Sequence, residues 1–222
     1  HLSDKPADVT DYAMDKLHGD ISAVIDDLNA EQVTLVGHDW GGAICWQYAM
    51  AQPERISKLV IMNLTHPRGY AAVVADATPA QAENVAYAKR FASSTPGDDQ
   101  VPEQVLNAGE RRGDRPEVAA RYRAAFEQSS WNGMMNYYRA NYGSLLGVSE
   151  DKETFVKNID RPVLQLHGLE DTAVDKDGLR DTWNWIGRDY TLVTVPDAGH
   201  FVQWDAAELV SETMKWWLLA RP

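Results

Sequence analysis

The stretch that decides the fold runs from Gln32 to Gly42 and reads QVTLVGHDWGG. Its first residues are rich in β-branched side chains and lead to a glycine, which is typical of a buried strand. Residues 41–52 have the composition of a helix and end immediately before a proline, which cannot continue one. The turn between them fits the pattern small-x-nucleophile-x-Gly of a nucleophile elbow, with Asp39 at the nucleophile position. A glycine-rich turn without chemistry is the alternative interpretation of this motif on its own.

The geometry of an elbow explains its small residues. Gly37 and Gly41 are expected to be small because the backbones of the strand and the helix pass close to one another there. The first N–H groups and the positive dipole end of the helix point toward the reacting centre. We therefore expect the backbone N–H of Trp40 to stabilise negative charge on a reacting oxygen.

Strand and helix patterns recur on both sides of a helical stretch, and this order predicts a parallel sheet of about four strands with a helical insertion after the second. The expected strands cover residues 32–37, 58–64, 162–167 and 190–195. The expected helices cover 11–30 (N-cap Thr10 or Asp11; apolar face Leu17, Ile21, Val24, Ile25 and Leu28), 41–52, 79–91 (N-cap Thr78), 116–128, 131–140, 177–186 and 206–219. The expected domains are a core part over 1–66, a helical cap over 67–159 and a second core part over 160–222.

Composition disfavours several kinds of partner. The 222 residues carry a formal net charge of −12, which argues against nucleic acids and anionic membranes and favours a neutral substrate. Cys45 is the only cysteine, so it forms no disulfide within the chain, and we expect a small buried hydrophobe. No apolar run approaches the roughly 20 residues of a membrane helix, and no His/Cys/Asp cluster has metal-ligand spacing. We expect a cytoplasmic protein without metal or cofactor.

An aspartate at the nucleophile position implies a different reaction from that of a serine. A serine that attacks an alkyl carbon would form an ether, which is a dead end. A carboxylate that attacks sp³ carbon forms an alkyl ester, which a base-activated water can hydrolyse at the ester carbonyl. Asp39 therefore predicts the opening of an epoxide or the displacement of a halide, followed by hydrolysis in which a histidine activates the water.

Two later loops supply the expected partners of Asp39. Chains with such an elbow place the nucleophile first, the acid second and the histidine third. Asp171 lies in GLEDTAVD after the third expected strand, and His200 lies in PDAGHFVQWD after the fourth. Residues beyond the carboxyl ends of parallel strands gather at one edge of the sheet, so we expect Asp171 to orient His200. Glu170 and Asp175 remain alternatives for the acid.

Other polar side chains are expected to line the pocket or to pack. We expect His38 to line the pocket or to pack in the core. We expect His66 and His167 to be structural, and His18 to be exposed or to cap a helix. Opening an epoxide also requires its oxygen to be polarised, and a phenol with a pKa of about 10 can donate the proton. The tyrosines available in the helical stretch are Tyr87, Tyr137, Tyr138 and Tyr142.

Taken together, these segments resemble the epoxide hydrolases of the α/β-hydrolase fold. The resemblance rests on SDKP (3–6), GHDWGG (37–42), MNLTHPR (62–68), YAKRF (87–91), MNYYRANY (135–142), GLEDTAV (168–174) and DAGHFVQWD (197–205). It implies an α/β-hydrolase fold with a mostly parallel sheet and an inserted helical cap. It implies a catalytic triad of Asp39, Asp171 and His200, with Tyr138 and Tyr87 binding the epoxide oxygen. The expected substrates are water and a small, neutral, apolar epoxide or haloalkane. Trp40 and His38 are candidates for the oxyanion or substrate site, and Met134, Phe201 and Trp204 are candidate pocket walls that could equally be core residues.

One departure from the family is large. Its members carry an oxyanion motif of the His-Gly-x-Pro type and several strands before the elbow, and this chain shows neither. We expect the chain to be the C-terminal portion of a longer protein, with an N-terminal portion as partner, and to be unstable and inactive on its own.

Two other functions remain open. A haloalkane or haloacid dehalogenase would use the same triad, with Trp40 and Trp131 as halide donors. A catalytically weak, ligand-binding member of the fold is the second alternative, and an intact triad argues against it. The Tyr-Arg pair in MNYYRANY favours the epoxide.

Overall fold

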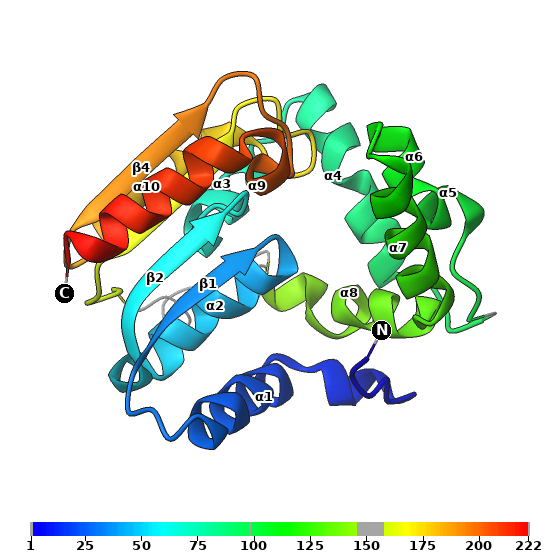
Figure 1. Cartoon of the computed structure of the whole chain (residues 1–222), viewed down its shortest axis with the longest axis horizontal. Helices are drawn as coiled ribbons and strands as arrows, with labels where there is room; N and C mark the ends of the chain where they lie inside the picture. Colours follow the sequence, from blue (N-terminus) through cyan, green and yellow to red (C-terminus); the bar gives the residue numbers. More distant parts are fainter. Residues whose placement is uncertain (1, 98, 146–157, 222) are drawn as a thin grey trace. The chain divides into compact units, whose positions relative to one another are not determined.

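The fold is built on one parallel sheet. The computed structural model describes residues 2–97, 99–145 and 158–221. The strands β1 (Val33–His38), β2 (Ile56–Met62), β3 (Val163–Gly168) and β4 (Tyr190–Val195) lie in chain order and are all parallel (Figure 1). The expected parallel sheet, with a helical stretch inserted after its second strand, is confirmed.

The chain divides into two compact units, which are described separately. The sheet unit comprises residues 14–87 and 143–222, and the helical unit comprises residues 1–13 and 88–142. These boundaries differ from the expected division. The first 13 residues group with the helical unit, and the flanks of the expected cap group with the sheet unit.

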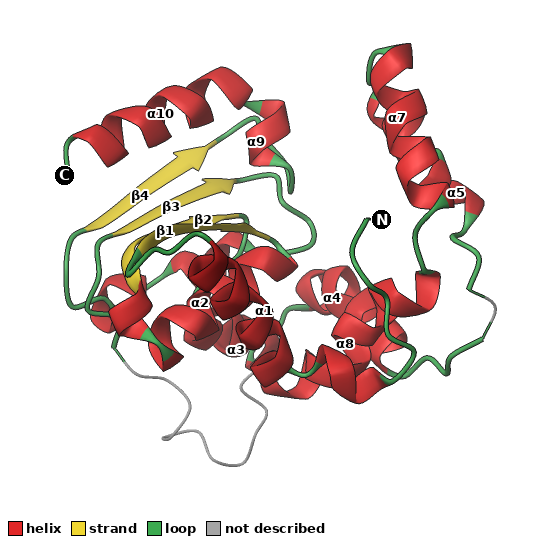
Figure 2. Ribbon diagram, turned by 60° about the horizontal axis from the view of Figure 1, so that its bottom comes forward, coloured by secondary structure: helices red, strands yellow, loops and turns green. Residues whose placement is uncertain are grey.

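Helices cover both faces of the sheet. One face carries α2 (Trp40–Ala51), with α1 (Met14–Asp27) and α3 (Pro67–Ala75) on the same side, and the other carries α10 (Ala207–Leu219) (Figure 2). Along β2, Leu59 and Ile61 belong to the core cluster that includes α2, whereas Val60 and Met62 belong to the cluster that includes α10. Because both faces are covered, β2 is apolar almost throughout.

The expected helix over residues 177–186 is wrong. Two 3₁₀ turns, η3 (Lys176–Leu179) and η4 (Thr182–Trp185), occupy the region. Asp181 between them has a left-handed backbone with φ 60°, which an α-helix cannot contain. Gly178 also packs closely on Thr65, since a Cβ atom there would lie 2.9 Å from the Thr65 hydroxyl.

The first helix begins later than expected. A 3₁₀ turn, η1 (Val9–Tyr12), comes first, and its cap is Asp8, which accepts a hydrogen bond from the Thr10 N–H at 2.8 Å. Ala13 is extended, so α1 starts only at residue 14. The helix does not continue through residue 12, because the ring of Tyr12 is buried and packs on the ring of Tyr137 in the helical unit. The centroids of these two rings are 5.4 Å apart. On α1, Leu17 and Ile25 are buried, whereas Val24 is exposed, as is Leu28 directly after the helix, so the packed stripe is narrower than expected.

The other expected helices are confirmed; their ends shift by at most one residue, except that the helix expected over 131–140 extends to Leu145. They are α4 (Pro79–Ala92), α7 (Pro116–Glu127) and α8 (Trp131–Leu145), besides α2 and α10. Thr78 begins α4 with a reciprocal pair, in which its hydroxyl accepts from the Gln81 N–H and its own N–H donates to Gln81 Oε1. Short elements not expected from the sequence are η2 (Pro53–Arg55), α3, α5 (Glu103–Leu106), α6 (Ala108–Arg112) and α9 (Val202–Asp205). None of the helices in the described ranges is long and apolar enough to cross a bilayer.

In the helical unit, Arg139 ties α8 to the loop that follows α4. Its guanidinium donates hydrogen bonds to the carbonyl oxygens of Ser94 (2.9 Å) and Thr95 (3.2 Å) and to Asn136 Oδ1 (2.7 Å). Asn136 is itself buried. A guanidinium suits this place because its planar fork of donors reaches several acceptors at once.

Replacing Arg139 by Met is expected to lower the free energy of unfolding by about 2–4 kcal/mol, because several partly buried acceptors lose a charged donor. Chemical denaturation measures the loss. Arg123→Met is the matched control, since Arg123 pairs with the exposed Glu103 and Glu127 and its replacement should cost much less stability. Equal losses in the two variants would contradict the special role of Arg139.

Candidate active site

Asp39 lies on a strained turn between β1 and α2. Its φ is +51° and its ψ is −122°, a combination that residues other than glycine rarely adopt. The turn depends on Gly37, where a Cβ atom would lie 2.4 Å from the Gly41 carbonyl oxygen and 2.7 Å from Cys45 Sγ. The expectation for Gly41 is wrong, because a Cβ atom on that residue would meet nothing within 4 Å. The close approach of strand and helix is therefore centred on Gly37.

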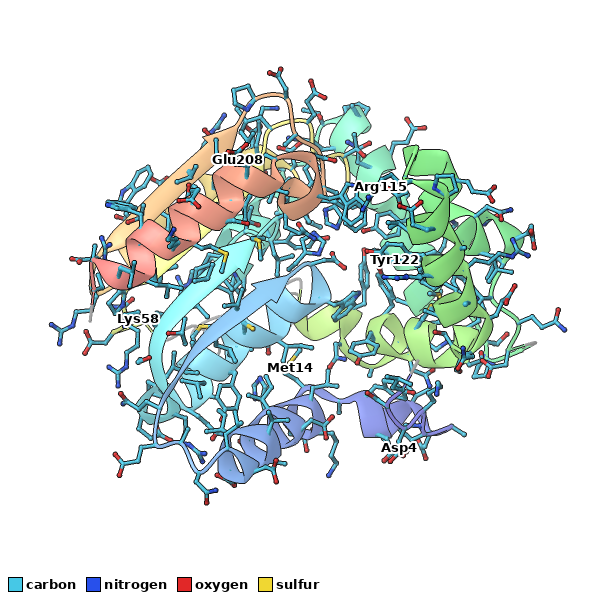
Figure 3. All side chains as sticks on the ribbon, viewed as in Figure 1. Asp4, Met14, Lys58, Arg115, Tyr122 and Glu208 are labelled. Atoms are coloured by element: carbon cyan, nitrogen blue, oxygen red, sulfur yellow. The ribbon has the colours of Figure 1, made fainter. Side chains whose placement is uncertain are left out.

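The structure brings Asp39, His200 and Asp171 together at the carboxyl ends of the strands. His200 Nε2 lies 3.3 Å from Asp39 Oδ1, and His200 Nδ1 lies 2.9 Å from Asp171 Oδ2. This edge of the sheet lies at the opposite end of β2 from Lys58, which is labelled in Figure 3 near the start of the strand. The side chains of Asp39, His200 and Asp171 are 32%, 18% and 0% exposed. An accessible carboxylate, an imidazole and a buried carboxylate in this order meet the geometric needs of a nucleophile, a base and an orienting acid.

Asp171 is the carboxylate that contacts His200, and its acidic neighbours do other things. Its Oδ1 accepts hydrogen bonds from two backbone N–H groups of its own loop, at 2.8 and 3.0 Å. Glu170 is exposed. Asp175 caps η3 by accepting from the Asp177 N–H at 2.8 Å.

The loop that carries His200 packs tightly on the end of β3. A Cβ atom on Gly168 would lie 2.3 Å from the Gly199 carbonyl oxygen and 2.4 Å from that of Ala198, so only glycine fits. His38 Nε2–H donates to the carbonyl oxygen of His200 at 2.7 Å. His38 therefore holds the main chain of the candidate base.

The charges of the three residues are coupled. Burial lowers the pKa of His200, but its hydrogen bonds to Asp171 and Asp39, with their charges, outweigh burial and raise the pKa to about 9. Burial raises the pKa of Asp39 and of Asp171, but the hydrogen bond and charge of His200 hold each pKa below its ordinary value. At neutral pH the site thus holds an imidazolium between two carboxylates.

This coupling predicts a loss of stability at alkaline pH. The folded pKa of His200, about 9, lies above its unfolded value of about 6.5, so its contribution is complete below about pH 6.5 and is lost as the pH rises through about 9. The lowered pKa values of the two carboxylates act oppositely, with a loss as the pH falls toward them. The histidine contribution is on the order of 3 kcal/mol. Denaturation at about pH 6 and about pH 10 should show the advantage over His200→Gln shrinking at the higher pH; a constant difference would contradict the coupling.

Two of the expected pocket residues in the sheet unit, Phe201 and Trp40, contact the triad. The Phe201 ring is 5.1 Å from that of His200 and 5.3 Å from that of His38, and Phe201 is 43% exposed. Trp40 is the first residue of α2, and its backbone N–H bonds to the Asp39 carboxyl. Trp204 lies on α9 and is also exposed.

The remaining expected pocket residues lie on α4 and α8. On α8, the Tyr138 ring makes an edge-to-face contact with Phe91 at 5.2 Å, and Met134 lies one turn earlier. Tyr87 lies one turn before Phe91 on α4, so the two share a helix face. The assignment of Tyr87, Tyr138 and Met134 to the pocket stays a prediction.

His66 and His167 are buried and serve the packing, as expected. His66 Nδ1 accepts from the Arg68 N–H, its ring stacks on Trp185 at 4.7 Å, and burial lowers its pKa to about 3. His167 Nε2–H donates to a carbonyl oxygen of the acid loop at 3.1 Å. His18 does not cap a helix but packs edge-on against Tyr48 at 5.4 Å. Across the described residues, no group of three or more His, Cys, Asp or Glu side chains is arranged to hold a metal ion.

Asn63 belongs to the site and was not expected from the sequence. It follows β2 directly, is fully buried and has a positive φ of 44°. Its Nδ2 donates to Asp171 Oδ2 at 2.8 Å and to the Gly199 carbonyl oxygen at 3.1 Å. The signal in the sequence is an amide placed immediately after the apolar run of a buried strand.

A model of the alpha/beta hydrolase fold family matches residues 2–207, and the chain belongs to that family. Relatives within it include epoxide hydrolases, which confirms the resemblance read from the motifs. Epoxide hydrolase 1 of Caenorhabditis elegans is 26% identical over 97% of this chain. This chain spans 55% of that protein's length.

Two solved structures are also similar. A variant of an epoxide hydrolase from Bacillus megaterium is 25% identical with a TM-score of 0.85, covering 98% of this chain and 80% of its own. An epoxide hydrolase from metagenomes of hot environments is 30% identical with a TM-score of 0.77, covering 98% of this chain and 78% of its own. The fold is therefore that of the α/β hydrolases.

Proposed function

We propose that this protein hydrolyses epoxides to vicinal diols through an alkyl ester on Asp39. The observation that carries the proposal is the strained Asp39, whose Oδ1 lies 3.3 Å from an imidazole that is bonded on its other side to the buried Asp171. An aspartate in this position favours attack on alkyl carbon. The similarity to epoxide hydrolases favours the epoxide over the halide.

In the first step the Asp39 carboxylate attacks one ring carbon, the carbon–oxygen bond breaks and an alkyl ester forms. The alkoxide takes a proton from a phenol, for which Tyr87 and Tyr138 are the candidates from the family resemblance. The carboxylate loses its negative charge in this step. One of the two groups that raise the pKa of His200 is thereby removed.

In the second step His200 works as the base. With Asp39 esterified, the pKa of His200 falls, and the proton it releases restores the phenol. Neutral Nε2 then takes a proton from water as its oxygen attacks the ester carbonyl, and the Trp40 N–H stabilises the oxyanion. Collapse breaks the bond between the carbonyl carbon and the alkyl oxygen, and the leaving alkoxide takes the remaining proton of the added hydroxyl, which frees the diol and the carboxylate. The sum is epoxide plus water to diol.

The origin of the new hydroxyl oxygen tests this pathway. In a single turnover with excess enzyme in heavy-oxygen water, the first diol should carry an unlabelled oxygen from the Asp39 carboxylate, and the label should enter Asp39. Mass spectrometry of the diol and of the peptide that contains Asp39 measures both. A first diol that carries the solvent label would show direct attack by water and would overturn the ester.

A turnover panel separates the other functions. Release of halide from haloalkanes, with no diol from any epoxide, would identify a dehalogenase with the same three residues. Binding of both substrate classes without an ester on Asp39 would identify a ligand-binding protein.

A further inference from the structure

The carboxyl end of β2 contacts two members of the candidate triad and the loop that carries the third. Asn63 Nδ2 donates to Asp171 Oδ2 at 2.8 Å, and the same oxygen accepts from His200 Nδ1 at 2.9 Å. The preceding residue, Met62, accepts the Asp39 N–H at its carbonyl oxygen, at 3.3 Å. Asn63 also donates to the carbonyl oxygen of Gly199, next to His200, so this strand end holds the nucleophile, the acid and the loop of the base.

The chemistry of its neighbours fixes the orientation of the Asn63 amide. One side of the amide faces Asp171 Oδ2 and the Gly199 carbonyl oxygen. Both of these atoms are acceptors, so the NH₂ group must point to them. Asn63 Oδ1 is buried and has no hydrogen-bond partner within residues 2–97, 99–145 and 158–221. Within the described residues, the Asn63 side chain thus donates two hydrogen bonds and accepts none.

The backbone of Asn63 offers a competing explanation. Its φ of 44° lies in the left-handed region, which asparagine and glycine tolerate best. If the turn alone required asparagine, glycine would serve equally well. The two explanations therefore differ in what Asn63→Gly should do.

We propose that Asn63 is a positioning residue for the hydrolytic step, whose amide fixes the Asp171 carboxylate against His200 and ties the His200 loop to β2. The role of Asn63 in ester hydrolysis rests on the proposed function. The effect of Asn63 on the Asp171–His200 pair is independent of the proposed function, because that pair exists in the protein without substrate.

The shared oxygen gives the proposal a direction. The Asn63 hydrogen bond is one of the interactions that hold the pKa of Asp171 low. Without it, Asp171 Oδ2 becomes a better acceptor for His200, so the pKa of His200 rises. The other titratable groups that interact with this pair are Asp39, His38 and His167, and His167 in turn interacts with Asp175. Burial lowers the pKa of His38 and of His167, which keeps both neutral at neutral pH.

The test compares Asn63→Gly with Asn29→Gly. Asn29 also has a positive φ, of 50°, but is exposed in the loop after α1, so it controls for the backbone effect. In Asn63→Gly we expect the His200 imidazole, followed by NMR titration, to titrate at higher pH. We expect ester hydrolysis to slow about 10–100-fold, with formation of the ester and KM little changed. Asn29→Gly should match the unmodified protein in all three measurements.

Asn63→Asp keeps the shape and the backbone preference but turns a donor into an acceptor beside Asp171. It should move the His200 titration further in the same direction, and it decides the question if Asn63→Gly does not fold. An unchanged His200 titration in either variant would overturn the positioning role, with or without turnover. A shifted titration in a protein that forms no ester from any epoxide would support the positioning role and overturn the proposed function.

Discussion

Replacing His200 by glutamine is expected to stop the reaction at the covalent ester. The Asp39 carboxylate can still attack the epoxide, because it has no proton to give up. Water then lacks a base, so hydrolysis of the ester should slow at least about 10³-fold. Incubation with a small epoxide should add one substrate mass to the intact protein, and peptide mapping should place it on Asp39.

Two variants control this result. Asp39→Asn should form no adduct at all, because the nucleophile is gone. His18→Gln changes a histidine that packs against Tyr48 and should turn over as the unmodified protein does. An adduct that accumulates equally in Asp39→Asn would place the ester elsewhere and contradict the role of Asp39.

Replacing both Tyr87 and Tyr138 by phenylalanine is expected to abolish epoxide opening, by about 10³-fold or more. In the proposed mechanism a phenol donates to the epoxide oxygen, so without both tyrosines the alkoxide formed by ring opening would have no proton donor. The loss should fall on ester formation and leave the hydrolysis of a preformed ester unchanged. Rapid-quench measurement of the ester separates the two rates.

Tyr122→Phe is the matched control for the tyrosine pair. Tyr122 lies on α7, where its ring stacks on Phe126 at 6.4 Å, and its loss of a hydroxyl should leave turnover unchanged. Full turnover in the double variant, with a loss only in Trp40→Phe, would contradict the epoxide and favour halide displacement.

The strands and most helices could be predicted because their patterns are local. β4 has the bounds expected from its β-rich run, and α7 and α10 differ from expectation by one residue each. The prediction of a helix over 177–186 was wrong because Asp181 has a left-handed backbone conformation and Gly178 packs on Thr65. Local composition indicates neither of these two features.

The site could be predicted only where its residues follow a motif. Asp39 follows from the elbow and His200 from chain order, but the choice of Asp171 over Glu170 and Asp175 needed the geometry of the loop. Asn63 was missed because its partners lie 108 and 136 residues away along the chain. A buried donor of this kind is recognised by what it touches, and sequence spacing does not show that.

The packing of Cys45 under the elbow has a chemical consequence under the proposed function, because epoxides are electrophiles. A thiolate attacks a strained cyclic ether at least as readily as a carboxylate does, so an accessible cysteine would be a site of self-alkylation. Cys45, the only cysteine of the chain, is buried beneath Gly37, and burial raises its pKa to about 12. At neutral pH Cys45 is therefore a buried, protonated thiol that an epoxide does not reach. An epoxide should then modify the protein at Asp39, where the ester is hydrolysed, and should not accumulate as a thioether on Cys45.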